Sequence, residues 1–257
     1  MIGSEGNASW GATQTPSPPN EAAAVRDRGL ARSYRSNAQS EMAVDLALVL
    51  AVDCSSSADF ADFRLQMDGI AAALRNPTLF DAIAAGSCQR IALALVQWSS
   101  RNSQVIAIAW RMVASRLDLE AIAQETEQAE RHWRPGGTGL AAAVDFSVAL
   151  LETLPISAGR RVIDVSGDGA DNEGGDAARA RNDALALDVT INGLPIITGS
   201  RELEAYYRDR VIGGPGSFIM PAENIWSFRD AMTRKLLREV GQKDLLTDVP
   251  CRLRRPV

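Results

Sequence analysis

One short segment of the sequence places oxygen-bearing side chains directly after an apolar run. The aliphatic run Leu46–Val52 is followed by Asp53, Ser55 and Ser57 in the spacing D-x-S-x-S. The two serines are two residues apart, so in an extended turn both hydroxyls can face the same side. One carboxylate and two neutral hydroxyls form an oxygen-only half-shell, which suits Mg²⁺. A helix N-cap cluster is the alternative for this segment taken alone.

Two further segments carry oxygen ligands at corresponding places. Thr138 lies in the glycine-bounded segment GGTG before a predicted helix, and Asp168 follows a second apolar run, RRVIDVS. Ligands of parallel α/β sheets bind at the carboxyl ends of the strands, so these segments are expected to meet. The predicted metal ligands are therefore Asp53, Ser55, Ser57, Thr138 and Asp168. Mg²⁺ is the expected ion, with Mn²⁺ and Ca²⁺ as alternatives.

The elements that must position these residues alternate between strands and helices. The apolar periods predict strands over 44–53, 90–100, 103–110, 160–169 and 189–196, and a short edge strand or a turn over 213–220. Helices are predicted over 58–76, 117–133, 140–154, 176–188, 202–212 and 225–240. This order predicts one doubly wound α/β domain over residues 44–240. Its sheet is expected to be mainly parallel, with one antiparallel edge strand and helices on both faces.

The ends of the chain differ from the middle in composition. Residues 1–43 are rich in Ser, Ala, Asn, Pro and Arg without an apolar period, which predicts a disordered leader. Residues 241–257 are expected to form a loose tail. The visible start has no charged segment followed by an apolar core, which favours the cytoplasm. Export is the alternative if the true start lies upstream, so the compartment stays open.

Net charge and hydropathy exclude two classes of partner. The chain of 257 residues has a net charge of -5, without the basic footprint of proteins that bind nucleic acid or anionic membranes. No stretch approaches the ~18 apolar residues that a membrane span needs. The oligomeric state cannot be predicted from these properties.

The few histidine and cysteine residues bear on other kinds of site. His132 is the single histidine, which argues against His-rich metal sites and against a Ser-His-Asp hydrolase. Cys54, Cys88 and Cys251 are odd in number and far apart. Neither a disulfide framework nor a zinc site is therefore expected, and the cysteines are interpreted as buried or incidental thiols.

The combined pattern resembles the von Willebrand factor type A domain with its metal-ion-dependent adhesion site. That site has D-x-S-x-S, a distant Thr and a later Asp usually followed by Gly, and all of these occur here in order, ending in Asp168-Gly169. The segments LVLAVDCSSS, GGTGLAAAVDF and RRVIDVSGDGADN are also similar in detail to a bacterial family of such domains of unknown function. The resemblance covers about residues 44–240.

The resemblance implies a protein-binding module. In relatives the two serines and the threonine bind Mg²⁺ directly or nearly so, and the aspartates often act through water. The remaining coordination position accepts an acidic side chain of a partner protein. This chain departs from many relatives by reading Ser-Gly-Asp-Gly instead of Thr-Asp-Gly around Asp168. Asp164, inside the apolar run, is then either a structural residue or an outer carboxylate of the site.

Two other functions use the same residues. A Mg²⁺-dependent hydrolase would use the cation to activate water, but the sequence offers no clear general base beside the cluster. The chain is therefore not expected to be an enzyme. A third hypothesis is a structural domain whose metal merely stabilises the fold.

Overall fold

The computed structural model describes residues 43–55, 60–132, 136–198 and 201–242. Its centre is a five-stranded sheet in the order β3-β2-β1-β4-β5. The strands are β1 (Ala43–Asp53), β2 (Ile91–Trp98), β3 (Gln104–Val113), β4 (Ser157–Gly167) and β5 (Val189–Pro195). Neighbouring strands pair in parallel except β2 and β3, which form an antiparallel hairpin at one edge. The predicted fold class is confirmed.

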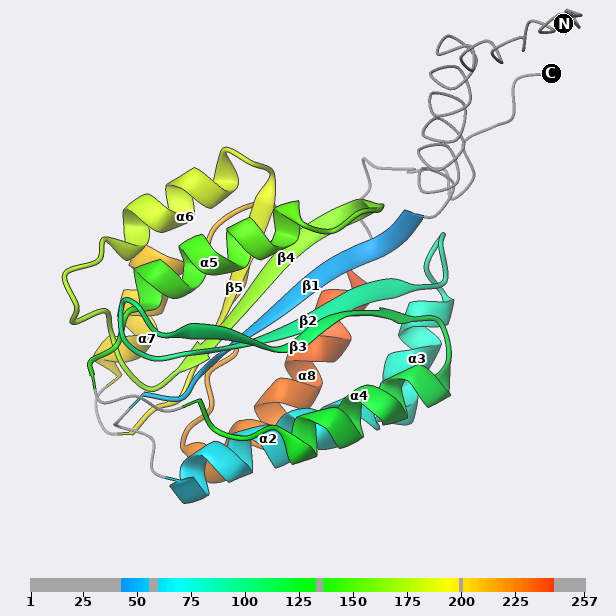
Figure 1. Ribbon diagram of the computed structural model, residues 1–257, viewed down its shortest axis with the longest axis horizontal. Coiled ribbons are helices and arrows are strands. Elements are labelled where there is room, and N and C mark those ends of the chain that lie inside the picture. Colours follow the sequence, from blue (N-terminus) through cyan, green and yellow to red (C-terminus); the bar gives the residue numbers. More distant parts are fainter. Residues whose placement is uncertain (1–42, 56–59, 133–135, 199–200, 243–257) are drawn as a thin grey trace, which may run out of the picture. The chain divides into compact units, whose positions relative to one another are not determined.

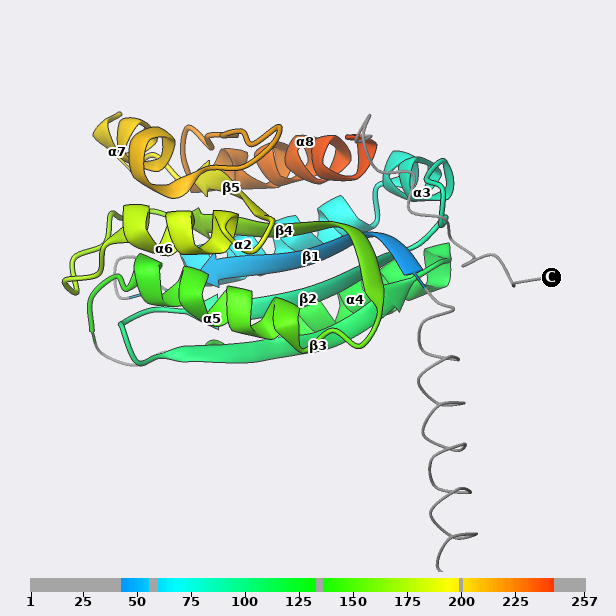
Figure 2. The ribbon, with the colours of Figure 1, turned by 90° about the horizontal axis from the view of Figure 1, so that it is seen from above.

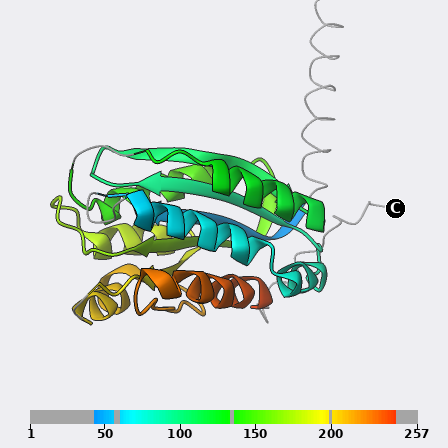
Figure 3. The same ribbon diagram turned by 90° about the horizontal axis from the view of Figure 1, so that it is seen from below.

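Helices cover both faces of the sheet (Figure 1). One face carries α5 (Leu140–Glu152) and α6 (Ala177–Leu185), which lie in front of the sheet in Figure 2. The other face carries α2 (Phe60–Leu74), α4 (Arg116–Gln128) and α8 (Phe228–Gly241), and Figure 3 shows α2 between the other two. The remaining elements are α3 (Pro77–Ala84), α7 (Glu202–Tyr206), the π-helical turn η1 (Tyr207–Val211) and the 3₁₀ turn η2 (Ile225–Ser227).

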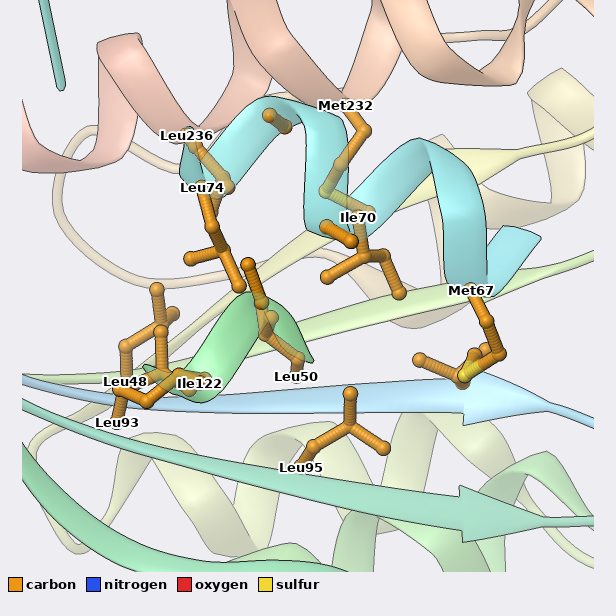
Figure 4. Packing of buried hydrophobic residues seen from close by; sticks show 14 of the residues in the cluster. Leu48, Leu50, Met67, Ile70, Leu74, Leu93, Leu95, Ile122, Met232 and Leu236 are labelled. Carbon is orange, nitrogen blue, oxygen red and sulfur yellow. The ribbon is translucent and has the colours of Figure 1, made fainter. Parts of the chain in front are cut away.

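Strand β1 explains why its sequence is apolar at almost every position. Its even-numbered residues from Leu46 to Val52 pack with α2, α4 and α8, and its odd-numbered residues from Ala47 to Ala51 pack with α5, α6 and η1. Side chains alternate across a strand, so a strand covered on both faces needs apolar residues on both. Figure 4 shows Leu48 and Leu50 of β1 facing α2. Each such large aliphatic side chain stabilises the fold by about 2 kcal/mol.

A buried charged cluster connects α8 to the sheet. Lys235 Nζ lies 2.9 Å from Asp164 Oδ1 and 3.1 Å from Glu239 Oε1, and all three side chains are buried. Asn192 Nδ2 of β5 donates to both carboxylate oxygens of Glu239. Burial raises the pKa of Asp164 to about 6, against the attraction of Lys235. This pairing makes Asp164 a structural residue, which decides between the two roles that the sequence leaves open for it.

The helix predicted beyond β5 takes another form, and the segment after it, predicted as a short edge strand or a turn, is mainly a turn. The helix expected over 202–212 consists of α7 followed by η1. The segment GGPGSFIM makes only isolated bridges within the described residues, between Ile191 and Gly213 and between Gly193 and Ile219. Gly214 and Gly216 have φ angles of 96° and 69°. The backbone therefore turns at these glycines, which is one of the two forms predicted for this segment.

The predicted leader, apart from Ala43, and the tail from residue 243 onward lie outside the described residues. Cys54 is a buried free thiol, as expected. Cys88 is disulfide-bonded, so the interpretation as an incidental thiol is wrong for this residue, and Cys251 lies outside the described residues. Sequence separation does not reveal which cysteines lie near one another in space. Within the described ranges, no helix has the length and apolar character needed to cross a membrane.

Candidate metal centre

The carboxyl ends of β1, β2 and β4 bring the predicted ligands to one edge of the sheet. β1 ends at Asp53, whose register partner on β2 is Trp98, and Val52 of β1 pairs with Ser166 of β4. Asp168 follows β4 directly. The segment with Thr138 joins the same edge, because the Gly139 N–H donates to the Ser99 carbonyl over 2.7 Å.

Asp53 is a buried carboxylate with one oxygen that lacks a partner. Its Oδ1 accepts a 2.7 Å hydrogen bond from the Ser55 N–H, whereas Oδ2 has no partner of standard geometry among the described residues. Burial, and after it the charge of Asp168, raise the pKa of Asp53 to about 7, against hydrogen bonds from Ser55 and from the Asp168 backbone that lower it. Ionising this group in the fold is costly unless a cation compensates the charge.

Two glycines allow the loops to approach one another closely. A Cβ added at Gly169 would lie 3.2 Å from Thr138 Oγ1, so the threonine hydroxyl lies against the Asp168-Gly169 turn. A Cβ added at Gly167 would lie 2.9 Å from Asp53 Oδ2 and 3.0 Å from Tyr207 Oη. Side chains at either position would therefore press on the proposed ligands.

Sequence reasoning missed the segment that holds the Thr138 loop. Asn172 Oδ1 accepts the Thr138 N–H over 2.7 Å, and the Asn172 N–H donates to the Thr138 carbonyl over 3.0 Å. Glu173 Oε1 accepts the Gly137 N–H, and Asp171 Oδ2 accepts the Ala141 N–H in the first turn of α5. Helix α5 has no side-chain cap of its own, so this distant carboxylate satisfies one of its free N–H groups. The polar run after SGDG was the available signal.

Tyr207 is a second residue that sequence reasoning did not assign to the site. It is fully buried in η1, and its hydroxyl has no hydrogen-bonding partner among the described residues. Burial raises its pKa well above the ordinary value, and the charges of Asp53 and Asp168 act in the same direction. The hydroxyl therefore stays protonated beside the carboxylates and can serve as a donor.

A small pocket lies beside Asp53 and Asp168. It has a volume of about 20 Å³, and its lining includes Asp53, Asp168 and Asp62, with Ile225 of η2. A volume of this size holds about one water-sized species. The carboxylates of Asp53 and Asp168, with the unpartnered buried oxygen of Asp53, are donors of the kind that suit a hard divalent cation.

The structure thus places four of the five predicted ligands at the same edge of the sheet, and the fifth lies outside the described residues. The backbone N–H of Ser55 donates to Asp53, Asp168 lines the same pocket as Asp53, and Thr138 lies against the adjoining turn. Ser57 is not described. No group of three or more His, Cys, Asp and Glu side chains in the described residues could hold a metal. The predicted ligand set has only two carboxylates and three hydroxyls, so it falls outside that class of site. Metal binding stays a prediction.

The single histidine anchors a loop through its backbone. The His132 N–H donates to Gln97 Oε1 over 2.7 Å, and its carbonyl accepts the Cys54 thiol at 3.2 Å. Neighbouring Arg131 donates to the carbonyls of Cys54 and Ser55. These contacts tie the segment after α4 to the D-x-S-x-S segment.

Comparison with known families identifies the family of this chain. The model of a family described as "Protein of unknown function (DUF1194)" matches residues 43–244. The chain belongs to this family. No curated protein sequence matches this DUF1194 chain.

Solved structures of von Willebrand factor type A domains share the fold of this DUF1194 chain. A von Willebrand factor type A protein from Catenulispora acidiphila aligns with a TM-score of 0.56 at 14% identity, over 78% of this chain and 44% of that one. Proximal thread matrix protein 1 from the mussel byssus, with a zinc-occupied MIDAS motif, gives 0.55 at 13%, over 79% and 47%. The pilus adhesin SpaC from Lactobacillus rhamnosus GG gives 0.55 at 12%, over 77% and 31%. The chain spans less than half the length of each, and these likenesses show the fold alone.

Proposed function

We propose that this domain is a metal-dependent protein-binding module. Asp53, Ser55, Ser57, Thr138 and Asp168 hold Mg²⁺, and an acidic side chain of a partner protein completes the coordination. The observation that carries the proposal is Asp53, a buried carboxylate with an unpartnered oxygen beside Asp168 and the Thr138 loop. A divalent cation there would compensate the charge that burial otherwise penalises.

The ligand set explains why the ion would attract an acidic partner. Three of the five side chains are neutral hydroxyls, so the protein neutralises the cation less completely than an all-carboxylate site would. A partner carboxylate would then form a strong charge-assisted contact in a partly dry interface. Mn²⁺ and Ca²⁺ accept the same oxygen donors and are alternatives to Mg²⁺.

Calorimetric titration of Mg²⁺ tests the site directly. The wild type should bind the ion, whereas Thr138→Ala and Asp53→Ala should lose measurable binding while keeping the wild-type circular dichroism spectrum. Thr126→Ala is the matched control, because Thr126 is equally buried but bonds the Ile122 carbonyl within α4. If neither the wild type nor the control binds Mg²⁺, Mn²⁺ or Ca²⁺, the proposal is wrong.

Two further measurements separate the other hypotheses. A structural metal predicts that chelation unfolds the protein outright, whereas a binding module should stay folded and lose only its partner. A Mg²⁺-dependent hydrolase predicts turnover of a phosphoester panel that Asp53→Ala abolishes. Pull-down of a partner that requires Mg²⁺ and fails with chelator would support the binding module.

A further inference from the structure

A groove lies beside the candidate metal centre, between the start of α2 and the segment that follows α4. Its volume is about 560 Å³, and it is lined by Phe60, Phe63 and Arg64 from α2 and by residues 128–131 from the other wall. Figure 3 shows that α2 and α4 are neighbours on the same face of the sheet. The groove is large enough for a bulky side chain and part of its backbone.

An exposed aromatic side chain forms the rim of this groove. Phe60 is 67% exposed, whereas Phe63, one turn later, is fully buried and forms part of the main core. The groove therefore has a buried apolar floor, formed by Phe63, and a solvent-exposed apolar rim, formed by Phe60. Aromatic groups of this kind carry much of the binding energy at protein interfaces.

Hydrogen bonds from Arg64 keep the two walls of the groove together. Arg64 Nη2 donates to the Glu127 carbonyl over 2.6 Å, and its Nη1 lies 3.4 Å from the Ala129 carbonyl. Carbonyls at a helix C-terminus lack partners within the helix and attract cations, so this arginine fixes the end of α4 against α2. The shape of the groove is thus built into the fold.

Arg131 lies between the groove and the segment that carries the proposed ligand Ser55, and it contacts both. Its Nη2 donates to the Ser55 carbonyl over 2.6 Å and to the Cys54 carbonyl over 3.1 Å. The same residue lines the groove, so one side chain separates the groove from a proposed metal ligand. The charged residues of the lining are Arg64, Arg131 and Glu130, and Arg64 also forms an ion pair with Asp68 at 3.0 Å. The positive and negative charges around the groove are therefore balanced, and its distinguishing feature is the apolar surface of Phe60 and Phe63.

We propose that this groove receives a large apolar side chain from the same partner segment whose acidic residue docks on the metal. The inference rests on the proposed function and adds the sequence preference of the partner. The favoured partner is an extended acidic segment with a bulky apolar or aromatic residue a few positions from the docking carboxylate. The proposed metal suits the acidic residue of such a segment, and the apolar rim of the groove suits the neighbouring side chain.

Selection from a random peptide library displayed on phage tests this preference. The library is bound to the immobilised protein in Mg²⁺ and eluted with chelator. We expect enriched peptides to carry Asp or Glu together with a large apolar residue at a constant offset. A synthetic peptide of the most enriched sequence should bind Phe60→Ser about tenfold more weakly than the wild type.

Leu117→Ser is the matched control variant. Leu117 is 80% exposed in the first turn of α4, at the opposite end of that helix from the groove. The Leu117→Ser variant also loses an exposed apolar side chain, and it should bind the peptide as the wild type does. Both substitutions are at exposed positions, and unchanged melting temperatures would confirm that the folds are intact.

The other outcomes distinguish this inference from the proposed function. Chelator-eluted acidic peptides without an apolar preference, bound equally by Phe60→Ser, would overturn the groove while leaving the metal module standing. Peptides that require Phe60 but not Mg²⁺ would overturn the link between groove and metal. A selection without any chelator-eluted peptide would overturn both proposals.

Discussion

Replacing Asp53 by Asn should stabilise the metal-free protein while removing its response to Mg²⁺. Asp53 is buried, and its pKa is raised from 3.8 to about 7. Asn keeps the size of the side chain and an oxygen that can accept the Ser55 N–H, but it carries no charge. The variant therefore avoids the cost of ionising a buried carboxylate.

The magnitude follows from the pKa difference between the folded and unfolded states. Because the folded value is raised, the folded state holds the proton between pH 3.8 and about 7 while the unfolded state releases it. The contribution of Asp53 to stability is therefore greatest below pH 3.8 and is lost as the pH rises to about 7. Each unit of pKa difference corresponds to about 1.36 kcal/mol, so ionising Asp53 in the folded state costs about 4 kcal/mol at most. The new amide N–H₂ needs a partner, which reduces the expected gain to about 2 kcal/mol.

Urea unfolding in chelator measures this gain, with wild type and variant compared at each pH. At a pH of about 8 we expect Asp53→Asn to be more stable than the wild type by about 2 kcal/mol. The advantage should vanish near pH ~5 and become a disadvantage of about 2 kcal/mol at about pH 4, where the carboxyl of the wild type is neutral and only the cost of the amide remains. Adding Mg²⁺ should stabilise the wild type alone. A variant that is less stable than the wild type in chelator at high pH would refute the reasoning, because the buried charge would then already be compensated within the protein.

Three other predictions follow from the same structure. Affinity for Mg²⁺, measured by calorimetry, should fall about tenfold per unit as the pH drops below about 7, because Asp53 must lose its proton to bind; pH-independent affinity would contradict this. Gly167→Ala should lower the free energy of unfolding by about 1 to 3 kcal/mol, because its Cβ would press on Asp53; urea unfolding indistinguishable from wild type would show that the loops can separate. Lys235→Met should cost about 3 to 5 kcal/mol in urea unfolding, because Asp164 and Glu239 would remain buried without their cation, and a loss below about 1 kcal/mol would mean that these carboxylates bind protons instead.

The fold was predictable because hydrophobic period and strand order are local properties of the chain. The run Leu46–Val52 is apolar on both faces, which signals a strand between two helical layers, and the structure places it at the centre of the sheet. The hairpin of β2 and β3 was likewise visible as two apolar runs around a short polar turn. The curved segment after β5 was harder to predict, because its isolated bridges depend on neighbours distant in the sequence.

The types of the candidate ligands could be read from the sequence, but their supporting residues could not. D-x-S-x-S, GGTG and SGDG carry oxygen donors at strand ends, and a parallel sheet collects such ends at one edge. Tyr207, Asn172 and Arg131 have ordinary sequence surroundings. Their roles arise from contacts over 34 or more residues of sequence separation, such as the bond from Thr138 to Asn172.

The sequence by itself determined the layered α/β architecture and the oxygen character of the candidate site, because both follow from local pattern and residue type. Tertiary structure alone decided that Asp53 is buried with an unpartnered oxygen and that Asp164 pairs with Lys235. It also decided that a groove with an exposed Phe60 adjoins the site. Burial, charge pairing and surface shape depend on which distant segments pack together, and no local pattern in the chain encodes those distances.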